Sequence, residues 1–140
     1  MFKTKVTPSF GDIDGMKHVN NNRILEWFEL GGLDIYRYFT PDLDLDFENW
    51  KLIMVRKEAD FVGQLRFGED VEIRTYLLKI GNSSFTVRNE VWQSNELKAK
   101  GKTVIVHFDY VTQKSVPIPD DVRKKLEEHL ISEEDIGKNI

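Results

Sequence analysis

Two hydrophobic periodicities follow one another along this chain, and together they restrict its possible folds more than any other feature. Between residues 20 and 39, apolar side chains recur at helical spacing and place Ile24, Phe28 and Ile35 on one face. After residue 50 the pattern changes to the alternation typical of β-strands. A long apolar helix must be buried, and the alternating segments can cover it. The sequence therefore predicts an α+β fold in which one antiparallel sheet curls around one helix.

The expected elements are one strand, the helix, four further strands and a short closing helix. Any of Asn20, Asn21 or Asn22 can cap the helix, because a short amide accepts hydrogen bonds from free helical N–H groups. Pro41 stops the helix, and short turns around residues 81–82 and 94–95 predict consecutive hairpins. The predicted strands are 2–10, 52–61, 71–77, 85–91 and a long one from residue 98 that ends before Pro117, and the closing helix is 120–130.

Two adjacent glycines, Gly31 and Gly32, interrupt the apolar helix. Each glycine destabilises a helix interior by about 1 kcal/mol relative to alanine, so the pair needs an explanation. One explanation is a close approach of the helix backbone to the surrounding sheet, and the other is a local kink. We favour the close approach.

Length and composition narrow the functional classes. The 140 residues suit one domain spanning 1–140, and no repeat or linker divides them. The net charge of -4 gives no general attraction to nucleic acid or to anionic membrane. The absence of cysteine excludes disulfides, thiolate nucleophiles and cysteine-bound zinc. No stretch approaches the roughly 20 apolar residues of a membrane span, and the first residues lack the apolar core of a signal peptide. We expect a cytoplasmic protein.

The densest polar cluster occupies residues 10–22, where the first strand ends and the buried helix begins. Aspartate and asparagine form turns and caps, so this segment could simply reverse the chain. However, Asp12, Asp14, His18 and the three asparagines supply more polar groups than a turn needs. A carboxylate that faces free N–H groups at a helix start is an arrangement for acyl transfer. The N–H groups would stabilise an oxyanion, and the carboxylate would attack or activate water.

Metal and nucleotide motifs are missing from the chain. A calcium loop starting at Asp12 or at Asp42 fails, because neither start places glycine at the sixth position and glutamate at the twelfth. The histidines His18, His107 and His129 have no metal-ligand spacing. The sequence also contains no P-loop, GxGxxG or GxSxG. We expect no metal and no cofactor.

The run FGDIDGMKHVNN at residues 10–21, followed by Trp27 and Glu29, resembles the 4-hydroxybenzoyl-CoA thioesterase group of the hot-dog superfamily. It is also similar to the acyl-acyl carrier protein (acyl-ACP) thioesterases. The resemblance covers nearly the whole chain. It implies a hot-dog fold, hydrolysis of acyl-CoA or acyl-ACP thioesters, and a homodimer that can pair into a homotetramer.

The same resemblance assigns roles to individual residues. It makes Asp14 the catalytic general base or nucleophile, places His18 in the site, and gives the oxyanion contact to the backbone N–H near Asn21. Two positions depart from the pattern: Ile24 stands where tyrosine is frequent, and Met16 where the carrier-protein enzymes have asparagine. These departures argue against the carrier-protein substrate and against a catalytic His18.

Three further residues, Asn20, Trp27 and Glu29, are assigned to substrate binding. Glu29 lies at the edge of the apolar stripe, where it faces the site or is simply a half-exposed helix charge. Asp12 is expected to be structural, because its side chain can accept turn N–H groups. His107 is expected in the core or at an interface.

The strand lysines Lys98, Lys100 and Lys102 could meet coenzyme A phosphates, but a solvated face that blocks edge pairing is the favoured interpretation. Two other functions suit a hot-dog fold: a dehydratase or hydratase, and a non-catalytic acyl-binding module. The sequence motifs of the dehydratases and hydratases are absent. One sheet around one helix leaves a face and an edge uncovered, which favours a dimer with a site built between subunits.

Overall fold

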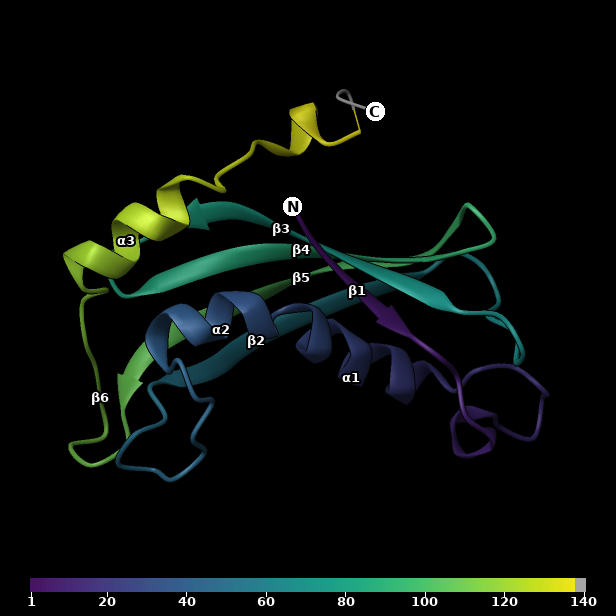
Figure 1. Cartoon of the computed structure of the whole chain (residues 1–140), viewed down its shortest axis with the longest axis horizontal. Helices are drawn as coiled ribbons and strands as arrows, with labels where there is room; N and C mark the ends of the chain where they lie inside the picture. Colours follow the sequence, from purple (N-terminus) through teal and green to yellow (C-terminus); the bar gives the residue numbers. More distant parts are fainter. Residues whose placement is uncertain (138–140) are drawn as a thin grey trace.

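A curved antiparallel sheet holds the helices α1 and α2 on its concave side in this computed structural model, which describes residues 1–137 (Figure 1). The strand order is β1-β3-β4-β5-β2, and the short β6 pairs with the end of β5. The sheet and the buried helix confirm the predicted α+β arrangement. The strands are β1 (Phe2–Val6), β2 (Leu52–Phe61), β3 (Val71–Ile80), β4 (Ser84–Gln93), β5 (Glu96–Asp109) and β6 (Lys114–Ser115), and the helices are η1 (Phe10–Asp12), α1 (Asn21–Gly31), α2 (Leu33–Phe39), α3 (Asp120–Glu127) and η2 (Glu133–Asp135).

The prediction that four consecutive strands form hairpins is confirmed for β3, β4 and β5 and is wrong for β2. Strand β2 has the predicted bounds, but it pairs with β5 on the far side of the sheet. The reason is that β1 already occupies the free edge of β3, with Val6 opposite Val71 and Phe2 opposite Thr75. Residues 62–70 therefore cross from the edge strand β2 to β3, which is next to the other edge. The first strand also ends earlier than predicted, at Val6, and η1 follows it.

The expected single helix is two helices, and both explanations for the glycine pair hold. A Cβ atom on Gly31 would lie 2.5 Å from Oγ1 of Thr75 and 2.8 Å from Cγ2 of Ile73, so α1 approaches β3 as closely as a glycine allows. At Gly32 the helix is interrupted, and a Cβ there would lie 2.7 Å from the hydroxyl oxygen of Tyr36. The ring of Tyr36 therefore folds back over the junction.

Replacing Gly31 with alanine should destabilise the protein, although alanine is the better helix former by about 1 kcal/mol. The added methyl group would overlap Thr75 and Ile73 on β3, and overpacking of this kind costs about 1–3 kcal/mol. Urea denaturation would measure the change in the free energy of unfolding. Gly11→Ala is the control, because its Cβ would meet only Oγ of Ser9 at 3.9 Å. A Gly31→Ala protein as stable as the wild type would contradict the close approach.

The core lies between the helices and the concave face of the sheet, in two apolar clusters. Between them the strands carry a buried polar group: Asn89 donates to Oγ1 of Thr75 at 3.3 Å, and Thr103 donates to Oδ1 of Asn89 at 3.2 Å. One cluster surrounds α2 and α3, and the other fixes the start of α1. The second cluster consists of Val19, Ile24, Trp27, Phe28, Leu65, Val71, Ile73, Val91 and Ala99.

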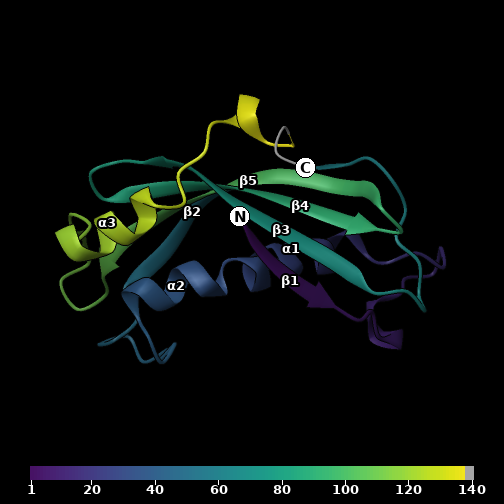
Figure 2. The same cartoon turned by 45° about the horizontal axis from the view of Figure 1, so that its top comes forward.

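The interpretation of the lysines on β5 as a solvated face that blocks edge pairing is wrong. Strand β5 is interior, between β4 and β2. Lys98 is only 9% exposed and bonds to Glu96 at 2.9 Å. Lys102 bonds to Glu133 at 2.8 Å, and residues 131–137 lie across the outer face of the sheet (Figure 2). The chain thus covers part of this face itself.

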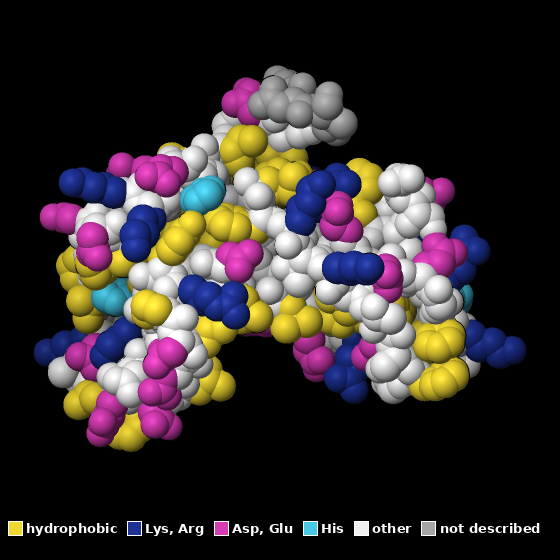
Figure 3. Space-filling view, viewed as in Figure 1, with side chains coloured by type: hydrophobic (Ala, Val, Ile, Leu, Met, Phe, Trp, Pro, Cys, Tyr) yellow, Lys and Arg dark blue, Asp and Glu magenta, His cyan; other side chains and the backbone are white. Residues whose placement is uncertain are grey.

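The opposite side of the molecule is uneven. Figure 3 shows the surface hollowed between the loop of residues 40–50 and the exposed face of α1, with hydrophobic side chains at both ends of the molecule. Within residues 1–137 no helix is long and apolar enough to cross a membrane.

Candidate active site

The polar segment between β1 and α1 is a closed loop with fixed ends. An antiparallel bridge joins Ile13 to Val19, and the N–H of Asn20 donates to the carbonyl of Asp12 at 2.8 Å. The N–H of Val19 donates to the carbonyl of Leu65 at 3.2 Å, which ties the loop to the segment after β2. The two ends of the loop therefore lie side by side, and α1 begins directly after its second end.

Asp12 has the structural role expected for it. Its carboxylate accepts hydrogen bonds from the N–H of Ser9 at 2.8 Å and from the hydroxyl of Ser9 at 3.2 Å. It also lies 3.5 Å from Nε of Arg23 on α1. These contacts join η1 to the first turn of α1.

Asp14 is held at the tip of the loop by backbone hydrogen bonds. Its N–H donates to the carbonyl of His18 at 2.9 Å, and its carbonyl accepts from Lys17 at 3.0 Å. Its Oδ1 accepts from the N–H of Met16 at 2.9 Å. Within residues 1–137 the second carboxylate oxygen, Oδ2, has no hydrogen-bond partner. The half-buried carboxylate is thus oriented through one oxygen and presents the other.

The first turn of α1 leaves one donor free. Asn20 is the cap: its Oδ1 accepts from the N–H of Asn22 at 2.9 Å, and its carbonyl accepts from Arg23 at 2.9 Å and from Ile24 at 3.4 Å. The N–H of Asn21 has no acceptor in the part of the chain that the structure describes. The partial positive charge of a helix start is concentrated on such unpaired N–H groups.

His18 takes part in the site through its backbone, because its carbonyl accepts from the N–H of Asp14. The half-buried imidazole forms no hydrogen bond with Asp14 in the described structure. The loop therefore gathers Asp14, His18, Asn20 and Asn21 at the start of α1, as the sequence predicts.

Two predicted substrate-binding residues lie farther along α1. Trp27 is 4% exposed and belongs to the core that fixes the helix start. Glu29 is eight residues beyond Asn21, or about 12 Å along the helix axis. Its Oε1 accepts from Nζ of Lys57 on β2 at 3.1 Å. Within one chain the structure does not bring Glu29 to Asp14.

Lys57 is a residue that the sequence analysis missed. Its ammonium group also donates to the carbonyl of Leu25 at 3.1 Å, so it ties the edge strand β2 to α1. Glu29 also affects Tyr36. The pKa of the Tyr36 hydroxyl lies far above its usual range, mainly because the group is buried and to a smaller extent because Glu29 is negatively charged. The sequence shows only a lysine within a predicted strand. It does not show that Glu29, 28 positions earlier, is the partner of this lysine.

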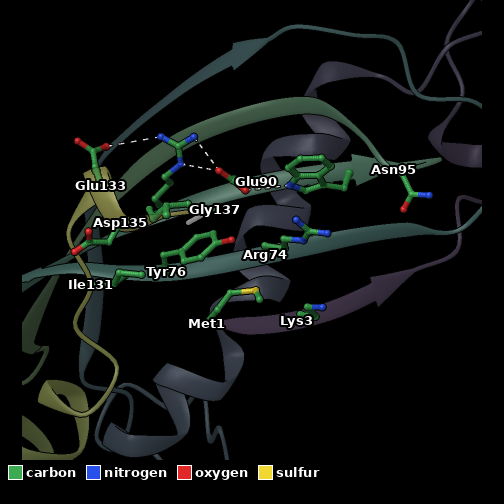
Figure 4. A pocket seen from close by; sticks show the side chains of 13 residues that line it. Met1, Lys3, Arg74, Tyr76, Glu90, Asn95, Ile131, Glu133, Asp135 and Gly137 are labelled. Carbon is green, nitrogen blue, oxygen red and sulfur yellow. Dashed lines mark hydrogen bonds and ion pairs between the residues drawn. The ribbon is translucent and has the colours of Figure 1, made fainter. Parts of the chain in front are cut away.

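A cavity of about 670 Å³ lies on the outer face of the sheet (Figure 4). Its floor carries the side chains of β3 and β4. Arg74 lies over the ring of Trp92, 4.3 Å from its centre, and Glu90 accepts from Arg88 and from Trp92. Its roof comes from residues 131–137. None of the residues of the Asp14 loop lines it, so this cavity is not the candidate site.

His107 is a core residue, one of the two places expected for it. Its Nδ1 lies 3.1 Å from the carbonyl of Val116, and its ring packs against Phe39. Within residues 1–137 no cluster of three or more histidine, cysteine, aspartate or glutamate residues could hold a metal ion.

Comparisons with known proteins show the family to which the chain belongs. Residues 8–126 match the thioesterase-like superfamily. The chain is 26% identical over 126 residues to a 1,4-dihydroxy-2-naphthoyl-CoA hydrolase of Prochlorococcus marinus subsp. pastoris, which covers 84% of this chain and 83% of the relative.

Two solved structures share the fold. A predicted thioesterase from Bacillus stearothermophilus is 40% identical, with a TM-score of 0.90 over 94% of this chain and 97% of that one. A thioesterase from Thermus thermophilus, complexed with coenzyme A and Zn, is 26% identical, with a TM-score of 0.79 over 89% of this chain and 96% of that one. The chain therefore belongs to the thioesterase-like superfamily and is a thioester hydrolase with the hot-dog fold.

Proposed function

We propose that this thioesterase hydrolyses acyl-CoA thioesters at the start of α1, with Asp14 as the reacting carboxylate. The observation that carries the proposal is the combination of a free oxygen on Asp14 with the unpaired N–H of Asn21. The substrate carbonyl accepts from this N–H, which stabilises the negative charge that develops on the carbonyl oxygen. The thiolate of coenzyme A is the leaving group, and the products are the free acid and coenzyme A.

Asp14 can act in two ways. As a general base it takes a proton from water while the water oxygen attacks the carbonyl carbon, and the proton then passes to the departing thiolate. As a nucleophile its own oxygen attacks and forms a mixed anhydride, which water hydrolyses in a second step. The orientation of the carboxylate by Met16 suits both routes.

Coenzyme A is favoured over the acyl carrier protein as the thiol carrier. The Prochlorococcus relative is a CoA hydrolase by name, and the Thermus structure holds coenzyme A. At Met16 this chain also lacks the asparagine of the carrier-protein pattern. We further propose a homodimer that can pair into a homotetramer, because β2 is an edge strand with no neighbour beyond it in the described chain.

The test is a panel of aliphatic and aromatic acyl-CoAs with detection of the released thiol. Release of free coenzyme A from at least one member is expected. Saturable binding of acyl-CoA without thiol release would support an acyl-binding module instead. Addition or loss of water at the acyl chain without thiol release would support a hydratase or dehydratase.

Replacing His18 with alanine should reduce turnover but leave clear activity. The loop depends on the backbone carbonyl of His18, which the variant retains. Within residues 1–137 no hydrogen bond joins the imidazole to Asp14. A catalytic acid or base contributes about 10²–10⁴-fold, so we expect kcat to fall by less than about 100-fold. Complete loss of activity at an unchanged melting temperature would show that the imidazole is catalytic.

A further inference from the structure

Two aromatic rings stack on the open surface beside the Asp14 loop. Phe10 is 82% exposed and Phe67 is 47% exposed, and their ring centres are 4.5 Å apart at an angle of 20°. Hydrophobic side chains are visible on the surface at the end of the molecule where η1 lies (Figure 3). Large exposed aromatic side chains next to a functional loop indicate a contact surface.

Hydrogen bonds hold the two backbone segments that carry the rings. The side chain of Gln93, which is 3% exposed, accepts from the N–H of Arg66 at 2.9 Å and donates to its carbonyl at 2.9 Å. Phe10 follows Ser9 in η1, where Asp12 holds the N–H of Ser9. The exposed pair is therefore presented by ordered backbone, and binding would not first have to order it.

The pair is directly linked to the catalytic loop. The carbonyl of Phe10 accepts from the N–H of Ile13 at 3.2 Å, and the carbonyl of Leu65 accepts from Val19 at 3.2 Å. Phe10 thus comes directly before the Asp14 loop, and Phe67 comes two residues after Leu65, which anchors that loop.

Two cations accompany the rings. Lys17 belongs to the Asp14 loop, and Arg66 immediately precedes Phe67. Neither forms an ion pair within residues 1–137, whereas Arg23 is paired with Asp12 and Glu26. The pKa of Glu96 is lowered first by its hydrogen bond to Lys98 and only last by the charge of Arg66. The surface therefore combines aromatic faces with unpaired positive charge.

We propose that Phe10 and Phe67 form the platform for the adenine ring of acyl-CoA, with Lys17 and Arg66 facing its phosphates. This inference rests on the proposed function and adds to it the recognition of the nucleotide. A purine has a π-face that stacks on aromatic side chains, and lysine and arginine bind phosphate oxygens. An acyl carrier protein has the same pantetheine arm without adenine, so the platform selects coenzyme A as the carrier.

Calorimetric titration with coenzyme A itself, in the absence of any acyl group, tests the platform. Phe67→Ala and Phe10→Ala should each weaken binding by roughly 10-fold, in line with the loss of one stacked base. Phe67→Trp should retain wild-type binding, because tryptophan restores an aromatic face. Val111→Ala is the matched control, since Val111 is 61% exposed and lies in the turn between β5 and β6.

The kinetic test compares acyl-CoA with the corresponding acyl-pantetheine, which lacks the nucleotide. In the wild type kcat/KM should be higher for acyl-CoA. Phe67→Ala should lower the ratio of the two kcat/KM values by roughly 10-fold. An unchanged ratio in both alanine variants would overturn the platform.

Three further results would overturn the platform. In the first, the wild type binds no coenzyme A. In the second, both alanine variants bind it as tightly as the wild type does. In the third, sedimentation shows that Phe67→Ala dissociates an oligomer while coenzyme A binding is unchanged. The last result would identify the pair as a subunit contact. The proposed function fails separately. If coenzyme A binds through Phe67 but no thioester is cleaved, the platform stands and hydrolysis does not.

Discussion

Replacing Asp14 with asparagine is expected to lower kcat/KM for the best acyl-CoA by roughly 10²–10⁴-fold. The amide keeps the size of the carboxylate, and its oxygen can still accept from the N–H of Met16, so the loop should remain in place. What is lost is the oxygen that acts as base or nucleophile. The measurement is a steady-state assay of thiol release beside a melting curve.

Asp12→Asn separates chemistry from structure in the same loop. The carboxylate of Asp12 bonds to Ser9 and approaches Arg23, so this variant should lose stability first. At a temperature where both variants are folded, Asp12→Asn should retain more activity than Asp14→Asn. If Asp14→Asn were near wild type and Asp12→Asn inactive, the roles assigned to the two carboxylates would be reversed.

Local patterns in the sequence predicted the elements that depend on neighbouring residues. The bounds of β2 and the hairpins from β3 to β5 follow from alternation and turn residues. Capping residues restricted the helix cap to Asn20, Asn21 or Asn22, and the structure shows that it is Asn20. The position of β2 beside β5 did not follow, because it depends on β1 occupying β3 first. Pairing between segments far apart in the sequence leaves no local signal.

The candidate site divides in the same way. Asp14, His18 and the N–H of Asn21 lie within one loop closed by short-range hydrogen bonds, so the motif itself specifies their arrangement. Lys57 and Glu29 are 28 positions apart and lie on different elements, so neither local sequence indicates that the two residues pair. Likewise, the stack of Phe10 on Phe67 brings together two loops whose sequences contain only isolated aromatic residues.

The free edge of β2 is the structural basis for the second large effect, the dependence of activity on a dimer. Strand β2 has ten residues and forms one edge of the sheet, with no neighbour beyond it in the described chain. Apolar side chains are exposed along and just after it: Met54 at 37%, Val55 at 58%, Phe61 at 40% and Val62 at 54%. An unpaired strand of this length favours pairing with another strand, and in a homodimer that strand is its own copy.

The location of the uncovered surface differs from the one expected. The sequence analysis expects one face of the sheet to be uncovered, but residues 131–137 cover part of the outer face, where Glu133 bonds to Lys102 of β5. Within the described chain the edge of β2 has no neighbouring strand, and the surface is hollowed beside α1 (Figure 3). Asn21 and Asn22 at the start of α1 are exposed on the single chain, so a substrate held there would need the partner subunit to exclude water.

Val55→Lys should therefore dissociate the protein and abolish its activity. Lysine on an edge strand blocks edge pairing, and the exposed position of Val55 allows the monomer to keep its fold. Sedimentation at low micromolar concentration beside the thiol-release assay would show a wild-type dimer that is active and a variant monomer that is not. Val111→Lys, which places the same charge on an exposed valine away from β2, should remain dimeric and active. A fully active monomer would refute both the dimer and the site shared between subunits.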